Sequence, residues 1–206
     1  MFQEMINGSI AVLTKPSVAT FEEHERNNLT WALIYSVIAG VINAIIAAIA
    51  ASLGLNQPAM TGLDPEMAAA AQPSIIGAIF GAIIFTVLVL LISWGITYLL
   101  GRAFGGTGQF GELAYGLSLF GAPLLVIGSI LNLIPFVGWI AGLALAIYNL
   151  YLTYLAIQSG MNLPSNKALY VILIQFAIAL AIGLCFILFF AAIFAAMMGA
   201  NGGFAP

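Results

Sequence analysis

The sequence is poor in charged residues. Only 5% of its 206 residues are Asp, Glu, Lys or Arg, whereas 63% are hydrophobic. A soluble domain carries about 25% charged residues, because its surface must be wetted by water. This scarcity excludes a water-soluble globular protein and predicts a chain that is embedded in a membrane. The net charge of −3 comes from a few end and loop residues, and we expect no nucleic-acid partner.

Residues that carry chemistry are equally scarce. A single cysteine and a single histidine cannot build a zinc site or a disulfide within the chain. His24 lies among Glu22, Glu23 and Glu25, but consecutive residues point around a helix instead of converging on a metal. The apolar stretches hold no charged group near a midplane and no Ser-His-Asp set. We therefore expect a protein that is not an enzyme, with no catalytic residue, metal or cofactor.

Long apolar runs dominate what is present. A helix that crosses the hydrocarbon core of about 30 Å needs about 20 residues, and in lipid it satisfies every backbone group. The sequence predicts an all-α, polytopic integral membrane protein with one membrane domain over residues 1–206. The expected spans are 30–53, 75–100, 112–133, 138–158 and 168–198. The last stretch is so long that we expect it to tilt or to continue beyond the membrane.

The four basic residues fall on one side of this arrangement. Lys15 and Arg26 precede the first span, Arg102 lies between the second and third, and Lys167 lies between the fourth and fifth. Basic residues are enriched in cytoplasmic loops of membrane proteins. We therefore expect the N-terminus in the cytoplasm and the C-terminus on the opposite side.

Residues 1–29 form a cytoplasmic or interfacial segment before the first span. Its apolar residues follow helical spacing and predict a short helix over 2–13 that lies in the membrane interface: Phe2, Met5, Ile6, Ile10 and Leu13. The run Lys15-Pro16-Ser17 ends this helix. Thr20 and Glu23 then have the spacing of a capping box.

A Gly-x-Gly-x-x-Gly pattern occurs at Gly106, Gly108 and Gly111. A dinucleotide-binding loop needs a strand before these glycines and an acidic residue about 20 positions after them. Here an apolar helix precedes them, and no Asp or Glu follows Glu112. We interpret the pattern as a hinge that turns the chain between spans two and three. Arg102 and Glu112, at its two ends, either pair across the hinge or reach water separately.

Small and weakly polar residues form stripes along most of the spans. Three such stripes contain Asn43, Asn132 and Asn149, and the fifth span contains Gln175. Small residues allow helices to approach closely in lipid, and a buried amide adds about 0.6 kcal/mol across helices. The stripes therefore either pack inside a bundle or place these amides along a substrate path. Pro123, in the middle of the third span, predicts a kink.

The run Gly105–Tyr115, with Phe110 and Glu112 inside it and Pro123 after it, resembles the Yip (Ypt/Rab-interacting protein) family of five-span membrane proteins. Further likeness lies at 13–16, 132–138 and 160–164. The resemblance implies a five-helix bundle with a cytoplasmic N-terminus. Eukaryotic relatives act in early secretory membranes and bind Rab-type GTPases and sibling proteins. The short segment before the first span lacks a long cytosolic arm, which argues against small-GTPase binding and for a prokaryotic-type member in a cell (inner) membrane.

These observations favour a membrane protein that acts through helix–helix contacts, as a scaffold or an accessory subunit. Its expected partners are membrane lipids, other membrane proteins or a second copy, and the resemblance implies a role in trafficking or membrane organisation. One alternative is a transporter or channel for a small solute or a lipid, in which Asn43, Asn149 and the Pro123 kink serve the path. Another is a membrane-shaping protein that acts through residues 2–13.

Overall fold

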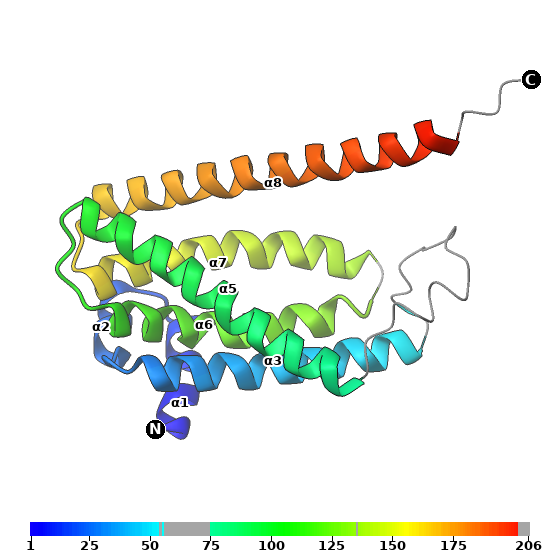
Figure 1. Ribbon diagram of the computed structural model, residues 1–206. Coiled ribbons are helices and arrows are strands. Elements are labelled where there is room, and N and C mark those ends of the chain that lie inside the picture. Colours follow the sequence, from blue (N-terminus) through cyan, green and yellow to red (C-terminus); the bar gives the residue numbers. More distant parts are fainter. Residues whose placement is uncertain (54, 56–74, 135, 202–206) are drawn as a thin grey trace, which may run out of the picture.

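The computed structural model describes residues 1–53, 55, 75–134 and 136–201, and this part of the chain is helical without a strand (Figure 1). Two short helices, α1 (Phe2–Thr14) and α2 (Val18–His24), are followed by five long ones. The long helices are α3 (Leu29–Ser52), α5 (Ile75–Ala103), α6 (Phe110–Leu131), α7 (Val137–Met161) and α8 (Ser165–Asn201). All five are long and apolar enough to cross a membrane. The predicted all-α class and the five predicted spans are confirmed.

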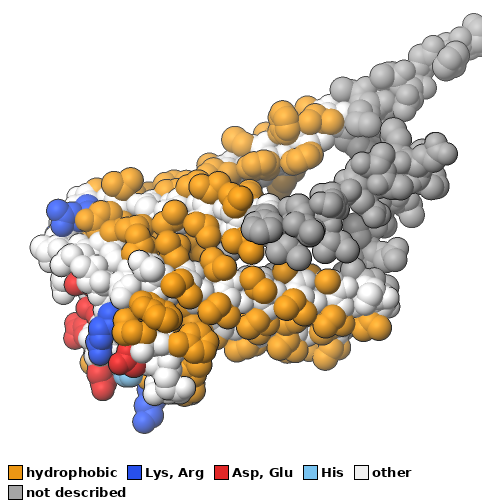
Figure 2. Space-filling view, turned by 60° about the horizontal axis from the view of Figure 1, so that its bottom comes forward, with side chains coloured by type: hydrophobic (Ala, Val, Ile, Leu, Met, Phe, Trp, Pro, Cys, Tyr) orange, Lys and Arg blue, Asp and Glu red, His pale blue; other side chains and the backbone are white. Residues whose placement is uncertain are grey.

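The long helices alternate in direction, so that the turns 104–109 and 162–164 lie at one end of the bundle together with α2 (Figure 1). Arg102 and Lys167 flank these two turns, and Lys15 and Arg26 flank α2. Figure 2 shows basic and acidic side chains gathered at this end, away from the apolar sides. We call it the basic end, and the opposite end the far end.

α6 forms the centre of the bundle. It packs mainly between α3 and α7, and most of its residues from Gly111 to Leu124 are buried. The ring of Phe110 contacts Tyr98 of α5 in an edge-on pair with centroids 5.5 Å apart. Leu119 lies nine residues later, which is half a turn further around the helix, and it lies beside Gly8 of α1. α5 therefore covers one face of the α3–α6–α7 layer, and the N-terminal helices cover the other.

The N-terminal segment is part of the core. Met5 and Val12 of α1 are fully buried, and the Tyr148 hydroxyl of α7 donates a hydrogen bond of 2.6 Å to the Leu13 carbonyl. The predicted short helix is confirmed, but the packed face runs through Met5, Gly8, Ser9 and Val12. Phe2 and Ile10, which the spacing placed on the same face as Met5, are exposed. The apolar spacing does not mark the face that packs on the bundle, which includes the small residues Gly8 and Ser9, and the position of α1 in the membrane interface stays a prediction.

The predicted capping residue of the second helix is wrong by one turn. Ser17 is the N-cap of α2, and its Oγ accepts a hydrogen bond of 3.1 Å from the Thr20 backbone N–H. The Thr20 hydroxyl instead donates to the Lys15 carbonyl at 2.8 Å. The helix starts earlier than expected because the extended residue after Pro16 already has a side-chain acceptor for the first free N–H groups.

The glycine-rich connection turns the chain between α5 and α6, as predicted. It is not a free hinge, because its backbone is held against the end of α7. The backbone N–H of Thr107 donates to the Met161 carbonyl at 3.0 Å. A Cβ on Gly108 would lie 1.8 Å from the carbonyl oxygen of Gly160, and one on Gly160 would lie 2.9 Å from Cα of Leu113. The glycines therefore allow the backbones of the turn, of α6 and of α7 to touch.

The two ends of the bundle differ in packing. Near the basic end, side chains such as Leu113, Leu152, Ile157 and Met161 are fully buried; we call this region the packed half. Toward the far end, α8 separates from its neighbours (Figure 1), and no residue of α8 from 173 to 193 is buried. This open half contains the second halves of α6 and α8 and the first half of α7.

Candidate functional site in the open half

A groove of about 520 Å³ lies in the open half between α3, α6 and α7. Its polar lining consists of Asn43 of α3, Ser129 and Asn132 at the end of α6, and Asn149 of α7. Gly121 and Gly128 of α6 and Gly142 of α7 line the same space. The absence of side chains at these glycines contributes to the hollow: a Cβ on Gly121 or Gly142 would meet nothing within 4 Å.

The groove opens on the face of the layer that α5 covers near the basic end. Gly121, Gly128 and Asn132 follow Phe110 by close to three, five and six helical turns, so they share its face of α6. Phe110 contacts Tyr98 near the basic end of α5. Toward the far end, α5 crosses to lie over α3 (Figure 1), and Gly40 of α3 approaches Thr86 of α5. This crossing leaves the groove uncovered by α5.

A smaller cavity of about 160 Å³ continues the groove toward the far end. It shares Asn43, Ser129 and Asn132 with the groove and adds Ala47 and Ala50 of α3. Asn43 lies 14 residues after the start of α3 and Asn149 lies 12 residues before the end of α7. At 1.5 Å per residue, both amides lie about 20 Å from the basic end, close to the middle of a bilayer about 40–45 Å thick.

The amides of the groove have unused hydrogen-bonding capacity. Within the described residues, no hydrogen bond joins the side chain of Asn43, Asn132 or Asn149 to another group. The nearby Thr153 hydroxyl donates to the backbone carbonyl of Asn149 at 2.8 Å and not to its side chain. Acyl chains offer no hydrogen bond, so an amide in hydrocarbon is costly until it meets a polar partner. The groove is therefore suited to an occupant that is both membrane-embedded and able to hydrogen-bond.

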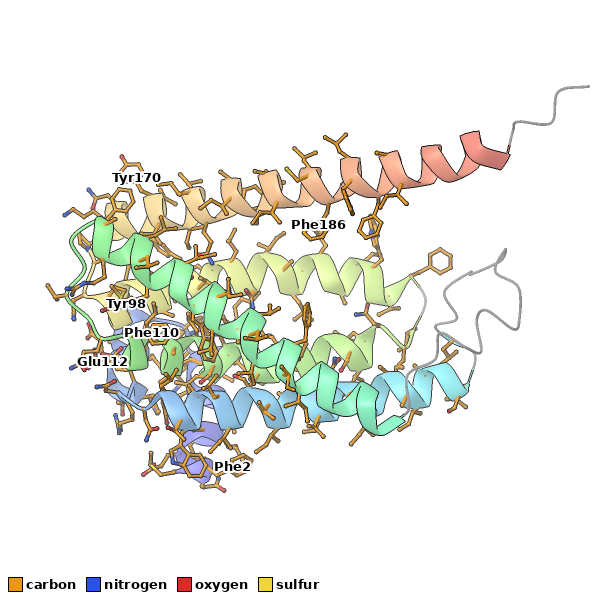
Figure 3. All side chains as sticks on the ribbon, viewed as in Figure 1. Phe2, Tyr98, Phe110, Glu112, Tyr170 and Phe186 are labelled. Carbon is orange, nitrogen blue, oxygen red and sulfur yellow. The ribbon has the colours of Figure 1, made fainter. Side chains whose placement is uncertain are left out.

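α8 borders the open half with an unpartnered inner face. Ala168, Val171 and Ile172 are buried against the bundle, and Gln175, half-buried, continues their face. Phe186 follows Ala168 by five helical turns, is 59% exposed, and lies between α8 and α7 in Figure 3. Gln175 does not line the groove, although it lies on the face of α8 that looks toward the bundle.

The structure brings together three of the residues that the sequence singled out, Asn43, Asn132 and Asn149. Packing inside a bundle is observed for part of the stripes, and the substrate path stays a hypothesis. Ser36 and Ser118 are buried in the bundle, whereas Gly142 and Asn149 line an open groove. Pro123 lies inside a continuous α6, half-buried beside the groove residue Leu124, and its predicted kink stays a prediction.

Arg102 and Glu112 do not pair. Arg102 Nη1 donates to the Gly106 carbonyl at 3.2 Å, and its guanidinium carbon lies 6.0 Å from the ring centroid of Tyr98. The Glu112 Oε2 accepts a hydrogen bond of 2.9 Å from the Gln109 backbone N–H, in the first turn of α6. Both side chains therefore stabilise the ends of their own helices and the turn between them.

Two polar contacts that no sequence pattern indicates hold the N-terminal segment to the basic end. The Ser159 hydroxyl of α7 donates a short hydrogen bond to Glu25 Oε2, and Asn27 Nδ2 donates to Gln109 Oε1 at 2.6 Å. Burial raises the pKa of Glu25 above its ordinary value of 4.5, and the Ser159 hydrogen bond lowers it in part. Because 134 residues separate Ser159 from Glu25, no local pattern predicts this pair.

Comparison with protein-family models matches residues 10–188 to the family described as Yip1 domain. The match runs from α1 into α8 and includes the glycine-rich turn and every residue that lines the groove. The comparison with curated proteins and the comparison with solved structures each give no match. The match covers most of the chain and agrees with five apolar helices of membrane-spanning length. This integral membrane protein belongs to the Yip1-domain family.

Proposed function

We propose that the protein is a non-enzymatic scaffold or accessory subunit whose open half binds a transmembrane helix of another membrane protein. The observation that carries this proposal is the groove in which Asn43, Asn132 and Asn149 converge from α3, α6 and α7. A helix with small and polar residues fits such a groove closely and supplies the hydrogen bonds that acyl chains lack. The exposed inner face of α8 offers the same helix a second, apolar contact surface.

The test is affinity purification of the full chain in a mild detergent, followed by mass spectrometry. We expect a stoichiometric membrane partner that is lost when Asn43→Leu and Asn149→Leu are combined. The matched control is Asn166→Leu, because Asn166 is exposed in the first turn of α8 and outside the groove. Recovery of a lone monomer from the unmodified chain would contradict the proposal, and recovery of a homodimer would identify a second copy as the partner.

The orientation that we propose places the basic end in the cytoplasm. All four basic residues lie at or beside this end of the helices, and the positive-inside bias then directs the far end outward. In a Cys185→Ser background, a cysteine at position 205 should react with a membrane-impermeant maleimide added outside intact cells. Labelling only after the cells are opened would reverse the orientation.

We further propose that this prokaryotic-type member, in a cell (inner) membrane, does not bind a small GTPase. Residues 1–28 fold into α1 and α2 against the bundle, with Met5, Val12 and Phe21 fully buried. They are therefore not available as an extended cytosolic arm. The same burial argues against an independent membrane-shaping segment, because deletion of residues 2–13 would uncover the packed half.

A lipid path is the second candidate, because the polar groups of the groove face the lipid at the side of the open half. The groove ends at Gly121 and Leu124, however, where the buried cluster of the packed half begins. A path would have to continue past Leu117 and Leu113, which are buried. Lipid scrambling in liposomes that falls when Asn43 or Asn149 becomes Leu would favour this candidate, and the absence of scrambling would remove it.

A further inference from the structure

A second polar recess lies near the basic end, apart from the groove. It has a volume of about 290 Å³ and is lined by Glu4 and Asn7 of α1, Glu23 and His24 of α2, Arg26 and Tyr115. Ligand pockets for drug-sized molecules measure about 300–1,000 Å³, so this recess suits a small polar group. Figure 2 shows charged side chains of both signs gathered over this part of the surface.

Tyr115 is the feature of the recess that points to a ligand. Its relative exposure is 1%, yet within the described residues its hydroxyl neither donates nor accepts a hydrogen bond, in contrast to Tyr148, which donates to Leu13. The hydroxyl oxygen itself is accessible, because within the described residues every fully buried side-chain oxygen or nitrogen has a hydrogen-bond partner. The Tyr115 side chain lines the recess, so an occupant of the recess is the partner within reach.

The other side chains of the recess are either hydrogen-bond acceptors that suit a cation or donors that suit an anion. The carboxylates of Glu4 and Glu23 accept hydrogen bonds from a cation. The His24 Nδ1 donates to the Thr20 carbonyl at 3.0 Å, which leaves Nε2 of the neutral ring as a further acceptor. Glu4 Oε2 also lies 3.2 Å from the N-terminal amine, so Glu23 is the carboxylate without an ion pair within the described residues.

Arg26, Asn7 and Tyr115 supply donors for an anion. Arg26 Nη1 donates to the carbonyls of Glu25 and Glu23 at 2.7 and 3.1 Å. These two bonds hold the guanidinium in place, and its remaining N–H groups stay free to bind a phosphate oxygen. The recess thus places acceptors for a cation beside donors for an anion.

The depth of the recess matches the headgroup layer of a bilayer. Tyr115 lies five residues after the first residue of α6, which is about 7.5 Å along the helix. The polar layer on each side of the hydrocarbon core is about 5–8 Å thick. Phe2 and Ile10 of α1 are exposed apolar side chains, as expected where a helix borders acyl chains.

We propose that this recess binds an ethanolamine phosphate group, as carried by the headgroup of phosphatidylethanolamine. Glu23 and Glu4 bind the ammonium, and Arg26 and the Tyr115 hydroxyl bind the phosphate. A trimethylated ammonium has no N–H to donate to the carboxylates, and a glycerol headgroup has no cation. The site therefore distinguishes phosphatidylethanolamine from phosphatidylcholine and from phosphatidylglycerol.

The test is native mass spectrometry of the full chain after incubation with equal amounts of these three lipids, all with the same acyl chains. We expect phosphatidylethanolamine to be retained about tenfold over the other two, and Glu23→Gln or Tyr115→Phe to remove most of that preference, as loss of a charge-assisted or buried hydrogen bond does. Glu22→Gln and Tyr170→Phe are the matched controls, because Glu22 and Tyr170 are exposed and lie outside the recess. Both test variants keep the size of the side chain and remove no hydrogen bond within the described residues.

Equal retention of the three lipids, or an unchanged preference in both test variants, would overturn the proposal. Competition by soluble O-phosphoethanolamine would show that the headgroup alone suffices, whereas binding of the lipid without such competition would assign the bilayer lipid as the ligand. The experiment does not involve the groove or a protein partner, so its outcome is independent of the proposed scaffold function.

Discussion

The packed and open halves of this bundle are built from the same helices, yet their side chains are buried to very different extents. α6 is buried along its first half and lines a groove along its second. Apolar content does not explain the contrast. The most apolar 18-residue stretch of α8 has a mean hydropathy of 2.9, the highest among the five long helices, and none of the residues in this stretch is buried. In lipid an apolar side chain gains nothing by leaving the acyl chains. Tight packing instead occurs where glycines allow backbones to touch and where the N-terminal segment is buried against the bundle.

The strongest test of this difference in packing is to add one methyl group to each half. In the packed half, Gly108→Ala places a Cβ 1.8 Å from the Gly160 carbonyl oxygen, so backbone must move. We expect a loss at the top of the range for single substitutions, above about 4 kcal/mol. In the open half, Gly142→Ala meets nothing within 4 Å and should be neutral or stabilising by up to about 1 kcal/mol. Thermal unfolding in mild detergent measures both variants, and equal losses would refute the distinction.

Truncation of an aromatic side chain tests the same contrast by removing contacts. Phe21 is fully buried and forms an edge-on pair with Phe120 at 6.0 Å between centroids. Its replacement by Ala should cost about 3–5 kcal/mol, the usual range for a core Phe. Phe186→Ala, at a position that is 59% exposed, should change stability by less than about 0.5 kcal/mol. A large loss in Phe186→Ala would show that the open half is packed in the isolated protein.

A single hydroxyl sharpens the comparison further. Tyr148→Phe removes the 2.6 Å hydrogen bond to the Leu13 carbonyl and should cost about 0.5–1.5 kcal/mol. Tyr151→Phe is the control on the same helix, since Tyr151 is exposed and has no side-chain hydrogen bond within the described residues. Limited proteolysis before α2 should become faster in Tyr148→Phe alone. An unchanged rate would mean that this bond does not hold α1 to the bundle.

The smallest expected effect concerns Glu25 and its dependence on pH. Burial raises the pKa of Glu25 in the folded protein above 4.5, its ordinary value. The folded state therefore holds the proton more tightly than the unfolded state, and stability falls as pH rises from about 4.5 through the folded pKa. Glu25→Gln removes this fall and keeps an oxygen that can accept from Ser159. Between about pH 4 and about pH 7, the melting temperature of Glu25→Gln should therefore rise relative to that of the unmodified protein. The control Glu22→Gln should show the same pH dependence as the unmodified protein.

The sequence was sufficient for the long helices, because twenty-residue apolar runs and turn residues are local signals. Proximity of distant groups was not predictable in the same way. The stripes indicated that Asn43, Asn132 and Asn149 lie on polar faces, but only the fold shows that the three faces meet in one groove. The apolar spacing predicted the helix α1 but not its contact with the bundle, which includes Gly8 and Ser9. No local feature links Glu25 to Ser159, or places Tyr115 and Arg26 in one recess, since the residues of each pair are far apart in the sequence.

The hydrogen bond between Tyr148 and Leu13 spans 135 residues of chain, and this separation sets an order of events during synthesis. The ribosome completes α1 and α2 long before α7, so their contacts with α7 can form only after α3, α5 and α6 have been made, although α1 also contacts Tyr35 of α3. Contacts of such long range form late. The beginning of this protein is thus among the last of its parts to reach its final place.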